Sequence, residues 1–287
     1  MIKLLAMFPQ ISQGVKHILI AGLFFGVINA AVKYYSHIPA IEIVFFRSIV
    51  TFFISFFMVK RLKLKIINEH SKDLFLRGIC GAIALTLYFY TIQQMPLATA
   101  VTILYLAPIF TVILAIPMNK EYPNKKQWPF LILAFCGAAL MKGTDLRVSL
   151  THFLMGLTAA LFAGLAYNFI RKLKGRAHHH LIIFYFPMVT LPFCIPLMIP
   201  VWVTPNIQDF LALIALGVLT QFAQVHMTKA YLLEKASKIS HFNYLTSGYA
   251  LLMGVFIFQE SINTLSIIGL IIIIIAVSIS SRIAAKE

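Results

Sequence analysis

MPLATAVTILYLAPIFTVILAIPMNKE, residues 95–121, has a degenerate copy, EKASKISHFNYLTSGYALLMGVFIFQE, at residues 234–260. A shift of 139 residues superposes the two stretches without a gap. The same shift aligns further identical residues: it places Asn29 on Asn168, Lys33 on Lys172, Val50-Thr51 on Val189-Thr190, Leu74 on Leu213 and Gly78 on Gly217. One shift that serves so many positions predicts two related halves, residues 1–145 and 146–287.

The composition indicates a membrane protein. Of the 287 residues, 60% are hydrophobic and 11% are charged, and the mean hydropathy is +0.89. Soluble domains have about a quarter charged residues. Because the chain is so apolar, we attribute its net charge of +15 to basic residues in the loops between membrane spans, and we expect no nucleic acid partner. The cysteines, Cys80, Cys136 and Cys194, lie inside apolar runs and predict neither a disulfide framework nor a metal site.

The hydrophobic pattern predicts ten transmembrane helices. A helix needs about 20 apolar residues to cross a bilayer. Runs of this kind lie near residues 16–36, 39–59, 74–94, 96–117, 125–142, 152–171, 181–202, 210–230, 236–258 and 262–281. The first is interpreted as a retained span because residues 1–13 show no signal-peptide cleavage site.

Basic residues indicate the orientation of these spans. With the amino terminus in the cytoplasm, 20 of the 24 Lys and Arg residues fall on the cytoplasmic side, Arg77 among them. Lys33, Lys142 and Arg147 fall outside, and Arg47 lies within a span. Positive charges remain on the cytoplasmic side of membrane proteins. We therefore expect both termini in the cytoplasm.

The odd number of spans in each half has a functional consequence. With five spans per half, the second copy enters the membrane upside down relative to the first. The predicted fold is therefore an all-α polytopic membrane protein with ten transmembrane helices as two inverted five-helix repeats. Secondary transporters follow this plan and expose a site between the halves to each side in turn. The alternatives are a non-transporting scaffold or a membrane-embedded enzyme, although no nucleophile–base pair or metal cluster with suitable spacing is visible.

Several short motifs carry a resemblance to a known family. They are Phe-Phe-Arg at residues 45–47, Leu-Arg-Gly at 76–78, and Ala-Thr-Ala, Leu-Ala-Pro and a terminal Glu at 98–121. In this order and spacing the chain resembles the EamA-like members of the drug/metabolite transporter (DMT) superfamily. The resemblance implies a ten-helix transporter in the bacterial inner membrane, without enzymatic activity or cofactor. Its substrate would be a small polar or zwitterionic metabolite, amino-acid-like or nucleotide-like, such as S-adenosylmethionine. Its partners would be membrane lipid and this substrate, in a monomer or homodimer.

Arg47 is the first candidate for substrate binding. It follows Pro39 by eight residues, so it lies about 12 Å along the second span. A charge at that depth costs about 3 kcal/mol or more unless a partner compensates it. That partner is a substrate carboxylate or phosphate, or alternatively backbone carbonyls or Glu42.

Amide and hydroxyl side chains supply further candidates. The repeat mates Asn29 and Asn168 lie at mirrored depths, where they contact substrate or join neighbouring helices. Polar residues recur on one face of each of two later spans, and polar groups at membrane depth face a bundle interior or a wet cavity. These residues are Gln221 and Gln224 in the eighth span, and Asn243 and Ser247 in the ninth. Three tyrosines are available to stack on a flat substrate: Tyr88, Tyr105 and Tyr244.

Two residues are candidates for movement and coupling. Pro108 removes a backbone hydrogen bond near the middle of the fourth span, which predicts a hinge or a plain packing kink. None of the nine acidic residues lies near the centre of a span. We therefore expect a facilitator or exchanger, with Glu42 as the only candidate proton carrier.

Overall fold

The computed structural model describes residues 12–104, 106–143, 148–234, 250, 252–260 and 264–285. Within these ranges the chain is helical and contains no strand. The helices are α2 (Gln13–Tyr34), α3 (Ala40–Arg61), α4 (Ser71–Gln94), α5 (Leu97–Leu104), α6 (Ala107–Asn119), α7 (Trp128–Gly143), α8 (Leu150–Lys172), α9 (His179–Met198), α10 (Ile207–Leu233) and α13 (Thr264–Ala285). Short 3₁₀ helices, η1 (Lys125–Gln127) and η2 (Ile199–Val201), lie before α7 and after α9.

Nine of the ten predicted spans coincide with helices in the part of the chain that the structure describes. Most of the remaining one, residues 236–258, falls outside the described residues. Seven segments are long and apolar enough to cross a membrane, and α13 contains a shorter apolar segment, Ile267–Ser280. The chain is therefore a multi-pass membrane protein.

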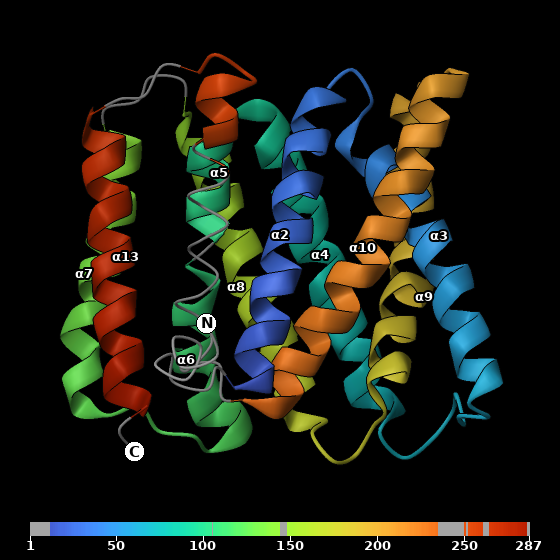
Figure 1. The fold of residues 1–287 in the computed structure, drawn as a ribbon, viewed down its shortest axis with the longest axis horizontal. Helices are drawn as coiled ribbons and strands as arrows, with labels where there is room; N and C mark the ends of the chain where they lie inside the picture. The colour runs from blue at the N-terminus through green and yellow to red at the C-terminus, as the bar shows by residue number, and fades with distance from the viewer. Residues whose placement is uncertain are drawn as a thin grey trace, which may run out of the picture.

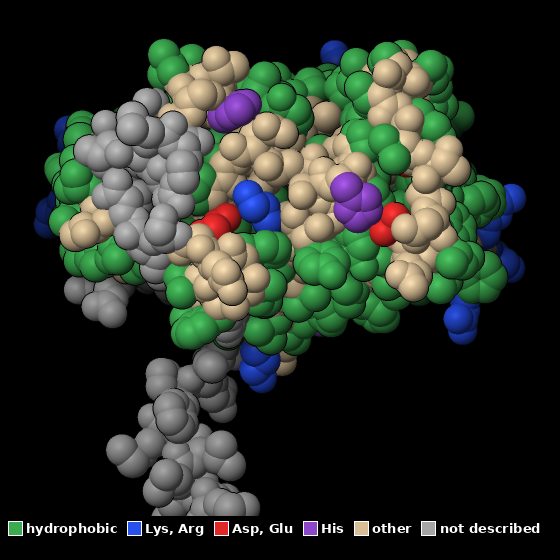
Figure 2. All heavy atoms as spheres, turned by 90° about the horizontal axis from the view of Figure 1, so that it is seen from above, with side chains coloured by type: hydrophobic (Ala, Val, Ile, Leu, Met, Phe, Trp, Pro, Cys, Tyr) green, Lys and Arg blue, Asp and Glu red, His purple; other side chains and the backbone are tan. Residues whose placement is uncertain are grey.

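Large apolar side chains on the helix exteriors fit this environment. Leu23, Phe53, Phe57, Ile132 and Phe222 are each more than half exposed. Figure 2 shows hydrophobic side chains around the periphery of the end it views. In a bilayer these side chains face lipid rather than water, so their exposure carries no hydrophobic cost.

The helices pack mainly across the boundary between the predicted halves (Figure 1). From the first half, α2 packs against α10, α3 against α9, α4 against α8 and α7 against α13. In Figure 1 the pair α7 and α13 lies at one end of the row of helices, and α3 with α9 lies toward the other. The interior of the bundle is thus built from both halves together.

Two glycines permit close approach at this boundary. A Cβ atom at Gly78 on α4 would lie 2.8 Å from Val189 Cγ2 on α9. A Cβ atom at Gly217 on α10 would lie 2.5 Å from Val50 Cβ on α3. The 139-residue shift relates both glycines to each other and both valines to each other. The same small-residue contact is therefore made twice, with the roles of the halves exchanged.

The predicted fourth span corresponds to two helices, the second of which begins beside Pro108. Helix α5 ends at Leu104, and α6 begins at Ala107 with Pro108 in its first turn. Proline is tolerated in the first turn of a helix because the N–H that it lacks has no intrahelical acceptor there. The start of α6 therefore falls where the sequence predicted a hinge or kink.

Candidate functional site

A cavity of about 120 Å³ lies inside the helix bundle. Its walls come from both halves of the chain: α2, α3, α4, α5 and α6 of the first half and α8, α9 and α10 of the second contribute lining residues. The polar and aromatic residues that line it are Asn29, Arg47, Arg77, Tyr88, Tyr167, Gln224 and Tyr231, with Phe25, Phe89 and Phe186. The rest of the lining is small or aliphatic, and Pro108 is part of it.

Arg47 brings a guanidinium group from α3 into this cavity. The residue is 1% exposed. Its Cζ lies 5.3 Å from the centre of the Phe89 ring and 5.9 Å from that of Phe186, so the charge rests between two aromatic faces. Its Nε and Nη2 atoms have no hydrogen-bond acceptor among the described residues. No ion pair joins Arg47 to Glu42 in this part of the chain.

Arg77 brings a second guanidinium group from α4. It is 2% exposed, and its Cζ lies 4.5 Å from the centre of the Phe186 ring. Its Nη2 donates a hydrogen bond of 3.2 Å to Gln224 Oε1 on α10. A Cβ atom at Gly81, one turn further along α4, would lie 3.2 Å from Arg77 Nη1. The same Cβ atom would lie 2.9 Å from Cδ2 and Cε2 of Phe186, so the glycine leaves room for both the Phe186 ring and the arginine side chain.

Aromatic rings form much of the remaining wall. The rings of Tyr167 on α8 and Tyr231 on α10 stack with centres 4.4 Å apart and planes inclined by 15°. Tyr88 on α4 is 6% exposed and lies next to Phe89. Flat faces of this kind can stack on a planar group or contact an apolar part of a ligand. The cavity therefore combines fixed positive charge with aromatic surface.

The structure brings together five of the residues predicted for the site: Asn29, Arg47, Tyr88, Gln224 and Pro108. Gln221 is 6% exposed but does not line this cavity. Four predicted residues lie outside the described residues: Tyr105, Asn243, Tyr244 and Ser247.

Asn168 lies away from the cavity and joins helices instead. Its Nδ2 donates to Thr111 O at 2.9 Å and to Gly164 O at 3.0 Å, and its Oδ1 accepts from Asn119 Nδ2 at 2.7 Å. These bonds connect α8 to α6 in a buried position. Its repeat mate Asn29 is 3% exposed and lines the cavity. The repeat mates therefore have different surroundings.

Glu42 is fully buried near the start of α3 and does not line the cavity. Its Oε2 accepts a hydrogen bond of 3.0 Å from Val203 N, in the connection between α9 and α10. Its Oε1 has no hydrogen-bond donor among the residues described. The carboxylate thus links the two halves at the end of the bundle that we predict to be outside.

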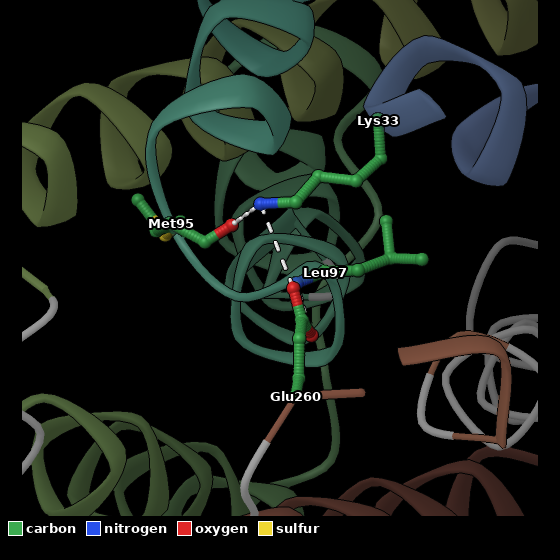
Figure 3. A network of polar contacts seen from close by, with 4 residues as sticks. All are labelled: Lys33, Met95, Leu97 and Glu260. Atoms are coloured by element: carbon green, nitrogen blue, oxygen red, sulfur yellow. Dashed lines mark hydrogen bonds and ion pairs between the residues drawn. The ribbon is translucent and has the colours of Figure 1, made fainter. Parts of the chain in front are cut away.

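A second polar network lies at the same end of the bundle, and Figure 3 shows its four residues. Lys33 Nζ lies 3.5 Å from Glu260 Oε1 and donates to Met95 O at 2.7 Å. The Glu260 carboxylate accepts from Leu97 N at 3.0 and 2.9 Å. Leu97 begins α5, and the amino terminus of a helix attracts negative charge. The network joins α2, the start of α5 and the segment that ends at Glu260.

The opposite end carries two further ion pairs. Arg171 Nε lies 3.2 Å from Glu121 Oε1, and Lys172 Nζ lies 2.9 Å from Asp73 Oδ1. The 139-residue shift relates Lys172 to Lys33 and Glu121 to Glu260. Related residues thus make cross-half ion pairs at both ends, although at the second end the lysine and the glutamate have different partners.

The sequence interpretation missed three polar residues of the cavity: Arg77, Tyr167 and Tyr231. Arg77 was counted with the cytoplasmic basic residues, whereas the structure buries its side chain in the bundle. The signal that was available is Gly81, four residues after Arg77 on the same apolar helix, because a residue without a side chain leaves space beside the arginine. Among the described residues, no group of three or more His, Cys, Asp or Glu residues is arranged to hold a metal ion.

Sequence comparison identifies the family. The chain matches the EamA-like transporter family over residues 12–142 and again over residues 150–282. The chain belongs to the EamA-like transporter family. This confirms the resemblance inferred from the short motifs of the sequence.

Relatives of this EamA-like protein are transporters by name. It is 30% identical to the pseudopaline exporter CntI of Pseudomonas aeruginosa, and the match covers 95% of this chain and 97% of the relative. It is 28% identical to mouse solute carrier family 35 member G1, over 81% of this chain and 68% of the relative. It is 24% identical to the S-adenosylmethionine uptake transporter of Rickettsia prowazekii, over 69% of this chain and 68% of the relative.

A solved crystal structure shares the fold of this EamA-like chain. The two superpose with a TM-score of 0.68, and the match covers 94% of this chain and 96% of the other. Their sequences are 14% identical, so this likeness concerns the fold alone.

Proposed function

We propose that this protein is a secondary transporter that moves a small polar or zwitterionic metabolite across the bacterial inner membrane by alternating access. The cavity between the halves carries the proposal, because it holds two buried arginines, two amides and stacked tyrosines. Polar and charged groups at membrane depth are costly and occur where they meet a substrate or an ion. Relatives are named for export of pseudopaline and for uptake of S-adenosylmethionine, so either direction of transport occurs in the family.

Ten helices in two inverted five-helix repeats, residues 1–145 and 146–287, supply the proposed mechanism. The repeated contacts of Gly78 with Val189 and of Gly217 with Val50 support a two-fold relation between the halves. The helix pairs support it as well. The 139-residue shift relates α2 to α8 and α4 to α10, so the packing of α2 against α10 corresponds to the packing of α8 against α4. In such a protein, rocking of one repeat against the other exposes a fixed central site to each side in turn.

Counterflow of labelled metabolites tests this function. Purified protein is reconstituted into vesicles loaded with one unlabelled metabolite of a panel of amino acids, nucleotides, organic acids and S-adenosylmethionine. We expect saturable uptake of the same labelled metabolite for at least one member, and slower uptake by Arg47→Gln. Arg61→Gln is the matched control, because Arg61 is exposed at the end of α3. Uptake that rises linearly with concentration for every metabolite would contradict a transporter and favour a pore or a leak.

A further inference from the structure

We propose that the cavity takes a substrate with two negative charges, carried by two carboxylates or by one phosphate group, and that Arg47 and Arg77 bind these charges together. The proposal rests on the transport function proposed above and specifies its substrate class. Arginine suits this task because its planar guanidinium binds carboxylate and phosphate with two parallel hydrogen bonds.

The two guanidinium groups share one wall of the cavity. Both Cζ atoms lie within 6 Å of the Phe186 ring, at 5.9 Å for Arg47 and 4.5 Å for Arg77. They approach this ring from neighbouring helices, α3 and α4. Two like charges so placed repel each other in a medium of low dielectric constant. A ligand that carries negative charge relieves this repulsion, and a cationic ligand increases it.

Four nitrogen atoms of this arginine pair lack acceptors. Nε and Nη2 of Arg47 and Nε and Nη1 of Arg77 are buried and have no hydrogen-bond partner among the described residues. A buried charged donor is costly to leave unpaired. Aromatic faces compensate only part of this cost, because they accept no strong hydrogen bond. The free donors therefore favour a ligand rich in anionic oxygen atoms.

In the part of the chain that the structure describes, no carboxylate lines the wall beside the arginine pair. No Asp or Glu is among the residues that line the cavity. Six acidic residues have contacts elsewhere: Glu42 with Val203 N, Glu69 with His70, Asp73 with Lys172, Glu121 with Arg171, Asp209 with His37 and Glu260 with Lys33. The sequence from 235 to 249, which lies outside the described residues, contains no Asp or Glu. Because a monoanion would leave one positive charge uncompensated, the pair favours a dianion.

Gln224 is a positioning residue for this arginine pair. Its Oε1 accepts the hydrogen bond from Arg77 Nη2 and so holds one guanidinium against the wall. Glutamate has nearly the same shape and would place a carboxylate on Arg77. In Gln224→Glu the protein itself would supply one of the two negative charges. Leucine would remove the acceptor but leave both positive charges available.

Ligand binding to the purified full-length chain in detergent tests the proposal. The probes form matched pairs that differ in one negative group: glutarate with its monoamide, and O-phosphoserine with serine. S-adenosylmethionine is the cationic probe, and the readout is the concentration of probe that raises the unfolding midpoint. We expect glutarate or O-phosphoserine to stabilise the protein at concentrations roughly tenfold or more below those of its matched partner. A preference for glutarate over its monoamide indicates a dicarboxylate substrate, and a preference for O-phosphoserine over serine indicates a phosphate substrate.

Variants separate charge from fold. We expect Gln224→Glu to weaken binding of the effective dianion by roughly tenfold or more, and Gln224→Leu to keep the preference for the dianion over its partner. Arg61→Gln should bind like the unaltered protein, since Arg61 is exposed at the end of α3. Equal binding within both matched pairs, absence of binding by both dianions, or a Gln224→Glu variant that binds the dianion normally would each overturn the proposal.

These outcomes are distinct from those that test transport. If vesicles show saturable counterflow of neutral or cationic metabolites only, the transport function stands and the dianion proposal is wrong. If dianions bind as expected but no metabolite shows counterflow, the arginine site stands as a binding site and the transport function is wrong.

Discussion

Lys33 Nζ lies 3.5 Å from Glu260 Oε1, and this ion pair connects the last turn of α2 to a segment of the other half. Both side chains are largely buried, with exposures of 19% and 15%. The same carboxylate accepts hydrogen bonds from Leu97 N at the start of α5. In the proposed cycle these contacts must separate before the predicted outer end of the cavity opens. They therefore stabilise the state in which that end is closed.

Substitution of Glu260 separates its two contacts. Glu260→Gln removes the charge but keeps an oxygen that can accept from Leu97 N, whereas Glu260→Leu removes both. We expect the free energy of unfolding to fall by about 1 kcal/mol for glutamine and by roughly 2–3 kcal/mol for leucine. The thermal unfolding midpoints of the two variants in detergent measure this difference, and the midpoint of Glu260→Leu should be the lower one. Equal midpoints for the two variants would show that Leu97 N contributes nothing measurable.

Asn168 and Asn29 are predicted to respond differently to the same substitution. Asn168→Ala removes two hydrogen bonds between α8 and α6 and one within α8, and should lower the free energy of unfolding by about 2 kcal/mol. Asn29→Ala should weaken substrate binding and leave the unfolding midpoint nearly unchanged, since Asn29 lines the cavity. Counterflow and thermal unfolding of both variants check this. A destabilised Asn29→Ala with normal transport would place Asn29 with the packing residues instead.

Pro108 is proposed as a hinge between α5 and α6. In Pro108→Ala the restored N–H can bond to a carbonyl one turn earlier and favour one continuous helix. We expect a several-fold lower maximal rate of counterflow with little change in substrate affinity. Pro117→Ala is the control, because Pro117 is exposed near the end of α6. A normal rate in Pro108→Ala would leave the proline as a packing kink.

Glu42 is proposed as the only candidate proton carrier. We expect counterflow in vesicles without a pH difference to persist in Glu42→Gln, because exchange requires no net proton movement. If transport of the unaltered protein follows an imposed pH gradient, Glu42→Gln should abolish that dependence. A gradient dependence that survives the substitution would assign coupling to another group.

Single cysteines test the predicted orientation. The background is Cys136→Ala, since Cys136 is exposed while Cys80 and Cys194 are buried. In intact cells, Thr204→Cys should react with a membrane-impermeant maleimide, and Lys63→Cys should react only after the membrane is permeabilised. Both positions lie in exposed connections at opposite ends of the bundle. The reverse labelling pattern would contradict the cytoplasmic placement of the termini.

The helices could be predicted closely because bilayer thickness sets the length of the apolar runs. The predicted span 39–59 corresponds to α3, Ala40–Arg61, and the predicted span 210–230 to α10, Ile207–Leu233. The helices extend beyond the apolar runs by a few residues, since capping residues such as Asn206 add polar first turns.

The candidate site was predicted only in part. Arg47 was recognised because an isolated charge within an apolar run lies at membrane depth, where it must be buried in the bundle or face a cavity. Arg77 was missed because it follows a basic loop closely, and position in the sequence does not give the direction of a side chain. The roles of Asn168 and Asn29 could not be told apart from the sequence, because an amide at either depth can bond to a neighbouring helix or face a cavity. Only the packing of α6 against α8 decides between these.

The contact between Arg47 and the Phe186 ring has a consequence for the proposed repeat. The shift of 139 residues that relates the halves places position 186 on position 47. In the proposed inverted repeat these two side chains occupy equivalent positions, and they lie against each other. In a symmetric ancestor assembled from two identical copies, an arginine here would have faced its own duplicate. In this single chain one of the two equivalent positions holds phenylalanine and the other holds arginine, so the centre of the molecule is chemically one-sided.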